Sequence, residues 1–296
     1  MTKEIKYDAE VNSYISISDR LVLFPHNGTT ATVWDMEDGR SLGLLEGHTS
    51  KISKALLNSI KKTAVTASFA QANQVRAVKI WSLETMQCTA NLTASSPATR
   101  LLNDRLLLGS SNGPIKVWDV GGSTPVALMD LEGHSDAIWS IDASDTSNVA
   151  LSGSQDKSVC LWDLRTGKCM RAMEGHTDWV FSVSMDSACK TAVSGSRDKK
   201  VKLWDLGSGQ CIETYDYGQF VCDVMMHESG SSFLASGYSP GRLKAWAFGT
   251  NKPLLDADLS SIGVSRMRSA ASRDLSVVAT YCNYLMRDVQ GASFWQ

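Results

Sequence analysis

The chain has 296 residues, of which 43% are hydrophobic and 20% are charged, and its 29 Lys+Arg against 31 Asp+Glu leave a net charge of −2. This balance argues against a dedicated binder of nucleic acids or anionic membranes, which would carry a basic excess. The chain has no apolar run near the ~20 residues that span a bilayer, and its first residues, MTKEIKYDAE, lack the apolar segment of a secretory signal. We expect a cytoplasmic protein, without excluding a nuclear location.

A repeated unit runs along the chain, and each copy ends in a short strand that contains a tryptophan. The gaps between these tryptophans are 47, 37, 44, 42, 42 and 49 residues. Each unit offers four runs of strand-forming residues between turn clusters, as in VFSVSM, TAVSG, VKLWD and CIETY. The sequence therefore predicts an all-β array of seven units. Their final tryptophans are Trp34, Trp81, Trp118, Trp162, Trp204, Trp246 and Trp295.

The first three units keep only part of the pattern. The first is strongly divergent. The second begins with Gly47-His48 and has Thr66 before Trp81, but its turn is lengthened to SFAQANQVRA without a clear aspartate. The third has Asn112 where an aspartate would stand, and no Gly-His opens it.

The fourth and fifth units are the most alike, with fifteen identical residues in the 32 positions that begin at Gly133 and Gly175. The identities gather at Gly-His, Ser-Gly-Ser, Asp-Lys and Leu-Trp-Asp-Leu. A repeat of 40–45 residues with Gly-His and Trp-Asp marks is the signature of WD40 propeller blades. Over nearly its whole length, the chain resembles the WD40-repeat family. The resemblance implies one domain, residues 1–296, folded as a seven-bladed β-propeller.

In that family a histidine, a hydroxyl, an aspartate and a tryptophan form a buried hydrogen-bonded chain in each regular blade. The indole N–H then has a partner, and the carboxylate orients the imidazole. Two copies at identical spacing favour this structural role over a Ser-His-Asp hydrolase. The expected tetrads are His134, Ser152, Asp156 and Trp162 in unit four, and His176, Ser194, Asp198 and Trp204 in unit five.

The last two units are irregular, and they leave two ways of closing the ring. In the sixth, YDYGQF replaces the Gly-His and Pro240 replaces the turn aspartate. If Trp295 ends the third strand of the seventh blade, the segment TKEIKY, residues 2–7, can supply its outer strand and cover the open edge. In the alternative, MRDVQG is a degenerate Trp-Asp turn and ASFWQ is a fourth strand.

The chain carries no motif of a phosphate-binding loop, a zinc protease, a serine hydrolase or a dinucleotide site. We therefore expect no enzyme, no cofactor and no metal. In the resembling family, partners most often meet the narrower face of the propeller, built by the loops that enter each blade and by the turn after its second strand. The residues expected to bind a partner on this top face are Lys51, Trp139, Gln155, Trp179, Phe181, Arg197, Phe220, Tyr238 and Arg242.

Aromatic residues beside an arginine are typical of interface hot spots, although the same rings could instead fill gaps between blades. We expect a scaffold or adaptor, a monomeric propeller within a complex, that holds other proteins or peptides, including acidic or phosphorylated ones. The alternative function is the substrate-recognition subunit of a ubiquitin-ligase-type or signalling complex. Three cysteines, Cys88, Cys169 and Cys211, fall at one place in three units, and we expect them to be reduced and buried on a strand.

Overall fold

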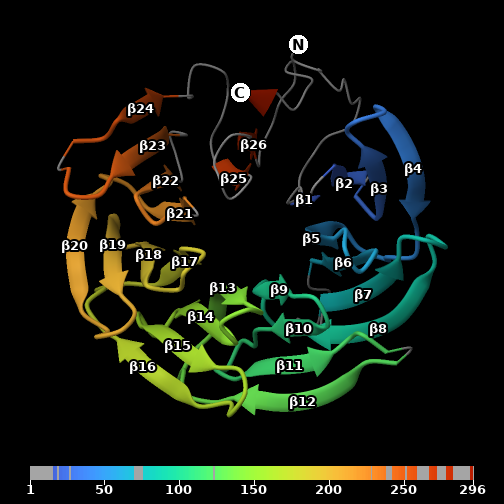
Figure 1. Cartoon of the computed structure of the whole chain (residues 1–296), viewed down its shortest axis with the longest axis horizontal. Coiled ribbons are helices and arrows are strands. Elements are labelled where there is room, and N and C mark those ends of the chain that lie inside the picture. Colours follow the sequence, from blue (N-terminus) through green and yellow to red (C-terminus); the bar gives the residue numbers. More distant parts are fainter. Residues whose placement is uncertain are drawn as a thin grey trace.

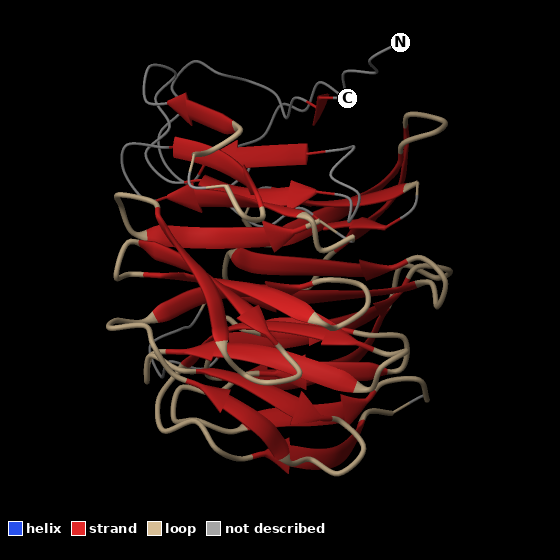
Figure 2. Cartoon of the chain, turned by 60° about the vertical axis from the view of Figure 1, so that its left-hand side comes forward, coloured by secondary structure: helices blue, strands red, loops and turns tan. Residues whose placement is uncertain are grey.

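The computed structural model describes residues 16–18, 20–26, 28–69, 76–122, 124–227, 229–237, 242–250, 252–258, 267–271, 278–282 and 294–295. The elements in this part of the chain are all strands, and they form seven antiparallel sheets around a central axis (Figure 1). Seen from the side, the sheets stand around the axis with turns at both ends (Figure 2). The sheets are called blades one to seven in chain order.

None of the described residues belongs to a helix that is long and apolar enough to cross a membrane.

The bounds of the strands follow the repeat, from the inner to the outer strand of each blade. The first three blades contain β1 (Ser16–Ser18), β2 (Leu21–His26), β3 (Thr30–Asp35) and β4 (Arg40–Leu45); β5 (Ile52–Asn58), β6 (Thr63–Ser68), β7 (Arg76–Ser82) and β8 (Cys88–Ala94); β9 (Thr99–Leu101), β10 (Arg105–Leu108), β11 (Ile115–Asp119) and β12 (Val126–Leu131).

Blades four to seven continue in the same order. They contain β13 (Ile138–Ser144), β14 (Val149–Ser154), β15 (Val159–Asp163) and β16 (Cys169–Met173); β17 (Val180–Met185), β18 (Thr191–Ser196), β19 (Lys200–Asp205) and β20 (Cys211–Asp216); β21 (Val221–Met226), β22 (Ser232–Gly237), β23 (Arg242–Ala247) and β24 (Leu255–Asp258); β25 (Met267–Ala271), β26 (Val278–Cys282) and β27 (Phe294–Trp295).

This arrangement confirms the predicted all-β propeller, and blade seven shows how its described strands are ordered. Strand β25 lies beside both β21 and β1, so blade seven sits between blades six and one. Trp295 pairs with Val278 of β26, the second strand of the blade. The tryptophan therefore occupies a third strand, and the alternative that placed it in a fourth strand is wrong. Residues 2–7, predicted to add the outer strand, lie outside the described residues.

The glycine of each Ser-Gly-Ser lets neighbouring blades approach closely. A Cβ on Gly195 would lie 2.5 Å from a methyl carbon of Val221 and 2.8 Å from one of Val224, both in the next blade. A Cβ on Gly153 would lie 2.6 Å from a methyl carbon of Val180. These distances are far below a normal carbon–carbon contact. Glycine is repeated here because the adjacent inner strand occupies the space of a side chain.

The inner strands are also joined by hydrogen bonds from one blade to the next. The amide of Val183 donates to Ser140 Oγ at 3.2 Å, and the amide of Val224 donates to Ser182 Oγ at 3.1 Å. In the next row, the amide of Met226 donates to Ser184 Oγ at 3.1 Å. A strand edge with unpaired amides is normally prone to pair with another chain. Here the serine hydroxyls of the preceding blade accept hydrogen bonds from some of these amides.

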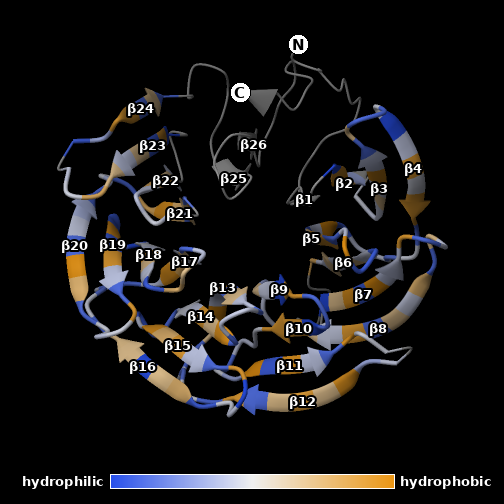
Figure 3. Cartoon of the chain, in the orientation of Figure 1, coloured by the Kyte–Doolittle hydropathy of each residue, from blue (hydrophilic) through white to orange (hydrophobic). Residues whose placement is uncertain are grey.

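The outer strands carry a bulge that exposes apolar side chains on the rim. In blades three to five, the register against the tryptophan strand skips Leu128, Met170 and Ile212, which are 46%, 45% and 54% exposed. The outer strands β12, β16 and β20 show apolar stretches in Figure 3. Among the predicted buried cysteines, Cys169 and Cys211 are exposed, so that expectation is wrong. Each begins an outer strand, where no further blade lies outside to cover it.

Candidate partner-binding face

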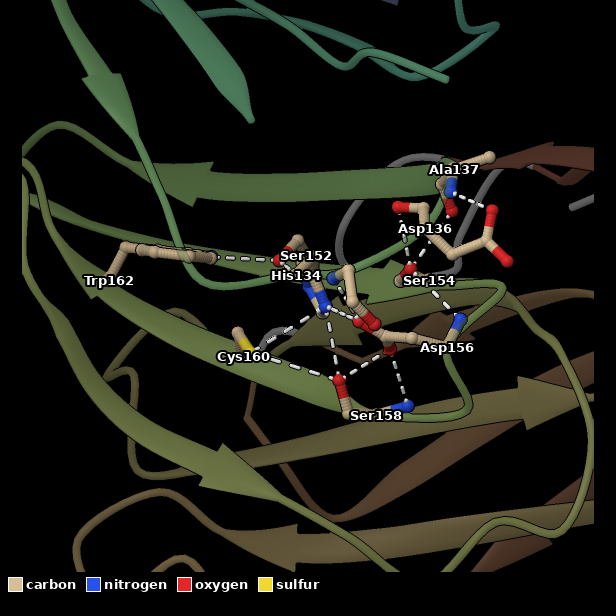
Figure 4. A network of polar contacts seen from close by, with 10 residues as sticks. His134, Asp136, Ala137, Ser152, Ser154, Asp156, Ser158, Cys160 and Trp162 are labelled. Carbon is tan, nitrogen blue, oxygen red and sulfur yellow. Dashed lines mark hydrogen bonds and ion pairs between the residues drawn. The ribbon is translucent and has the colours of Figure 1, made fainter. Parts of the chain in front are cut away.

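The tetrad residues of blade four form one hydrogen-bonded chain (Figure 4). The indole Nε1 of Trp162 donates to Ser152 Oγ at 2.7 Å, and that hydroxyl contacts His134 Nε2 at 2.7 Å. His134 Nδ1 lies 2.8 Å from Asp156 Oδ2. A neutral histidine protonated at Nδ1 donates to the carboxylate and accepts the serine hydroxyl, so every polar group in the chain has a partner.

Blade five repeats the same geometry 42 residues later. Trp204 Nε1 to Ser194 Oγ, Ser194 Oγ to His176 Nε2, and His176 Nδ1 to Asp198 Oδ2 are each 2.7 Å. Burial alone would raise the pKa of Asp198. The hydrogen bond from His176, with backbone N–H groups, outweighs burial and holds the pKa of that carboxyl below its ordinary value.

Blades two and three lack part of this chain. In blade two, Thr66 binds both His48 and Trp81 at 2.7 Å, but His48 Nδ1 has no hydrogen-bond partner among the described residues. Burial, with the charge of Lys79, lowers the pKa of His48 to about 4. In blade three, Leu108 takes the register position of the hydroxyl, and within the described part the buried Trp118 Nε1 has no partner.

Blade six replaces the polar chain with a lysine among aromatic rings. Ala235 stands at the register position of Ser194, opposite Lys244. The Lys244 ammonium donates to the backbone oxygen of Tyr217 at 2.9 Å and lies 5.8 Å from the centre of the Trp246 ring. This substitution was not predicted, because an isolated lysine in a strand usually indicates a solvent-exposed position.

The two Ser-His-Asp sets have no access to a substrate. Ser152 and Ser194 are both completely buried, each beneath its tryptophan. A nucleophilic serine must reach its substrate, so these hydroxyls serve the hydrogen-bonded chain rather than acyl transfer.

The tetrads place the top-face loops, because the turn after the second strand is bonded to the loop that enters the blade. In blade five, Ser196 Oγ donates to the carbonyl of Asp178 at 3.0 Å, and the amide of Arg197 donates to the carbonyl of Trp179 at 2.9 Å. Blade four has the same link between the Gln155 amide and the Ala137 carbonyl at 2.8 Å. The second serine of Ser-Gly-Ser is therefore repeated to hold the loop that carries the variable residues.

A second set of bulges interrupts the pairing between the first and second strands of several blades. The register between the first and second strands skips Trp139 in blade four, Phe181 in blade five, Cys222 in blade six and Ser53 in blade two. A bulge re-aims the side chain of its extra residue and is common next to binding sites. The side chains of Trp139 and Phe181 therefore do not follow the regular alternation of side chains along their strands.

Three of the predicted partner-binding residues form one aromatic cluster across blades four and five. The rings of Trp139 and Trp179 are stacked, 6.0 Å apart and 16° from parallel. Phe181 meets Trp139 at 5.5 Å and Trp179 at 6.1 Å, edge-on to both. All three side chains are partly exposed. The rings do fill space between two blades, yet they keep a surface that a partner can cover.

Arg197 extends this cluster toward blade six. Its guanidinium carbon lies 4.8 Å from the centre of the Trp179 ring and 5.5 Å from that of Phe220. Its Nε is 3.7 Å from Asp178 Oδ2, and the two side chains are 40% and 37% exposed. Two rings and a carboxylate therefore orient the guanidinium. We call Trp139, Trp179, Phe181, Arg197 and Phe220 the aromatic–arginine platform.

The other predicted binding residues lie outside this platform or serve other contacts. Gln155 is half-buried in the blade-four turn. Lys51 is exposed in blade two, where its side chain lies over Gly28 of blade one. Arg242 Nε lies 3.1 Å from Asp256 Oδ1, within its own blade. Tyr238 falls outside the described residues, as do most of the lengthened turn and the segment MRDVQG.

Sequence reasoning missed a group of charged residues on the inner strands of four blades. Arg100 of β9 and Asp142 of β13 form an ion pair of 3.0 Å, and Asp223 of β21 accepts a hydrogen bond of 2.8 Å from Ser182. Burial, with the charge of Arg100, lowers the pKa of Lys54 on β5 to about 8, although Asp223 and Asp142 oppose the shift. The only signal for these residues in the sequence was the alternation of apolar and polar residues along the inner strands.

Comparison with known proteins relates part of the chain to a family. The family model described as "WD domain, G-beta repeat" matches residues 125–163 and 167–205, which cover most of blades four and five. The chain aligns with a crystal structure of the computationally designed Ika8 protein with a TM-score of 0.73 and 22% identity, over 94% of this chain and 84% of that chain. The fold is a β-propeller, and blades four and five are similar to the WD40-repeat family.

Several relatives match shorter stretches. The "CCR4-associated factor 4 homolog" of Candida glabrata is 29% identical over 47% of this chain and 27% of that protein. "Autophagy-related protein 16" of Arabidopsis thaliana is 27% identical over 51% of this chain and 30% of that protein. "Eukaryotic translation initiation factor 3 subunit I" of Botryotinia fuckeliana is 46% identical over 39 residues, 12% of its length. The chain thus spans less than a third of each of these relatives.

Proposed function

We propose that this propeller is a non-catalytic scaffold that holds a protein or peptide on the aromatic–arginine platform. The observation that carries the proposal is the row of rings and one guanidinium that runs across blades four to six on the loop side of the tetrads. Partly exposed aromatic residues beside an arginine are the usual make-up of interface hot spots. Phe220, at the edge of the row, is 37% exposed.

Two further observations support a binding role rather than a catalytic one. Both serines of the Ser-His-Asp sets are buried structural groups. Among the relatives, one is named as an associated factor and another as a subunit of an initiation factor, which are roles in assemblies. We propose that this chain likewise works as a monomeric propeller within a larger complex, in the cytoplasm or the nucleus.

A quantitative pull-down from a lysate of the source cells, with the full chain as bait, tests the site. Arg197→Ala should weaken capture of the specific partner by about 1.5–3 kcal/mol, the range of a charge-assisted hydrogen bond. The cost to folding should be smaller, about 0.5–1 kcal/mol for partly exposed cation–π contacts. Thermal melting checks that both baits are folded.

The matched control is Lys168→Ala, an exposed lysine in the turn between β15 and β16 at the opposite end of the blade. It should retain the partner at the wild-type level. If Lys168→Ala loses the partner while Arg197→Ala retains it, the platform is not the binding site.

A further inference from the structure

The Arg197 guanidinium is held in one orientation, with one of its edges left open. The rings of Trp179 and Phe220 lie against it, and Asp178 approaches its Nε. No hydrogen bond from either terminal Nη atom of Arg197 occurs within the described part of the chain. The two Nη groups form the fork that binds a planar anion through two parallel hydrogen bonds.

Asp178 is fixed as firmly as the arginine. Its Oδ1 accepts a hydrogen bond of 2.9 Å from the amide of Trp179, and its backbone carbonyl accepts one from Ser196. The other oxygen, Oδ2, faces the Arg197 guanidinium at 3.7 Å. The carboxylate therefore stays beside the guanidinium when a ligand arrives, and it places a fixed negative charge next to the site.

The pair is absent from the matching positions of blades two and four, so the fold does not impose it. In blade four, Asp136 holds the position of Asp178, but the residue that matches Arg197 is Gln155. In blade two, the matching positions are Ser50 and Phe69. Since the same loop geometry forms without an arginine–aspartate pair, the pair is available to serve recognition.

We propose that the Nη edge of Arg197 receives the side-chain carboxylate of a glutamate or aspartate in the partner, and that Asp178 makes the site prefer this singly charged group over a phosphate. A carboxylate brings one negative charge and matches the fork in its plane. A phosphorylated side chain carries −1.5 to −2 charges at neutral pH, and the fixed Asp178 carboxylate repels the additional charge. The neighbouring rings of Trp139 and Phe181 provide an apolar surface for the residue next to the acid.

This inference rests on the proposed function and refines its ligand. Arginine side-chain NMR tests it directly, with the Nε–Hε resonance of Arg197 followed in the full chain. The probes are two single-residue compounds, N-acetyl-glutamate methylamide and N-acetyl-phosphoserine methylamide. The wild-type protein should bind the glutamate probe about threefold tighter or better, as expected for like charges partly screened by water.

Two variants give the decisive comparison. Asp178→Asn keeps the oxygen that accepts from the Trp179 amide but removes the charge, and it should strengthen phosphoserine binding by about tenfold and reverse the preference. Arg197→Lys, which lacks the fork, should bind both probes weakly, as judged by the backbone amide of residue 197. Tighter phosphoserine binding by the wild type, or an unchanged preference in Asp178→Asn, overturns the inference.

These experiments also distinguish failure of this inference from failure of the proposed function on which it rests. If neither probe shifts Arg197 while Trp179→Ala still abolishes partner capture in the pull-down, the platform binds a partner without an acidic residue, and the carboxylate assignment fails alone. If no platform variant alters capture, the proposed function itself fails.

Discussion

Removing the Ser194 hydroxyl should destabilise blade five far more than the loss of one oxygen atom suggests. Ser194 is completely buried and bonds two side chains at 2.7 Å, the indole of Trp204 and the imidazole of His176. Ser194→Ala leaves the indole Nε1 of Trp204 and the imidazole Nε2 of His176 buried without a partner. Each unsatisfied group costs about 1–3 kcal/mol, so we expect a loss of about 2–6 kcal/mol in the free energy of unfolding.

A double-mutant cycle with Trp204→Phe isolates the hydrogen bond from the packing. Phenylalanine has no indole N–H, so Ser194→Ala in that background strands only the histidine and should cost at least about 1 kcal/mol less than in the wild type. The assay is urea unfolding followed by circular dichroism, with hydrogen exchange on the amides of β18 and β19 to localise the effect.

Blade six provides the control for ring size, because it buries Trp246 to the same degree but has Ala235 at the position of Ser194. Trp246→Phe reports the cost of the smaller ring without the serine bond. If the two blade-five substitutions add within about 0.5 kcal/mol, the tetrad is not an energetically coupled unit.

Three further outcomes are expected. His48 has a folded pKa of about 4 against 6.5 for the free side chain. The stability that its neutral form contributes should therefore be complete above pH 6.5 and fall by about 2–3 kcal/mol as the pH drops to 4. His48→Gln should flatten the pH dependence of the free energy of unfolding, measured with urea, and an unchanged slope would contradict the assignment. Gly195→Ala should cost about 1–3 kcal/mol from overpacking against blade six, and a melting temperature equal to the wild type would rule out the close approach. Deletion of residues 1–7 should speed hydrogen exchange near Trp295 and leave blade five slow; unchanged exchange near Trp295 would argue against closure by that segment.

The sequence was sufficient for the repeat and for the two complete tetrads, because each depends on residues at fixed spacing within one unit. Trp162 and Ser152 are ten residues apart on paired strands, and the next unit repeats that spacing. The roles of Gly195 and Lys244 were not predictable in the same way. Each depends on the neighbouring blade or an outer strand, whose distance no single repeat reveals.

The candidate site shows the same limit more sharply. The sequence indicated Trp139, Trp179 and Arg197 as variable residues on one face, but it gave no sign that two inner-strand bulges would bring the rings into contact. A bulge adds one residue to a strand without an obvious mark in the letters. The approach of Asp178 to Arg197 also went unseen, since 19 positions separate them in the sequence and only the folded loop places them together.

The repeated residues and the variable residues of a blade are joined by one set of hydrogen bonds. In blade five, Asp198 accepts from the Thr177 amide at 3.1 Å while it holds His176, and the Asp198 amide donates to Ser196, which in turn holds the loop of Asp178. The buried tetrad is thereby connected through short hydrogen bonds to the loop that carries the platform. Rigid support lowers the entropy lost when a partner binds. A blade of this kind can therefore change its surface residues freely, provided that the hydrogen-bonded chain beneath them is complete, and blades four and five are the two in which the described residues complete it.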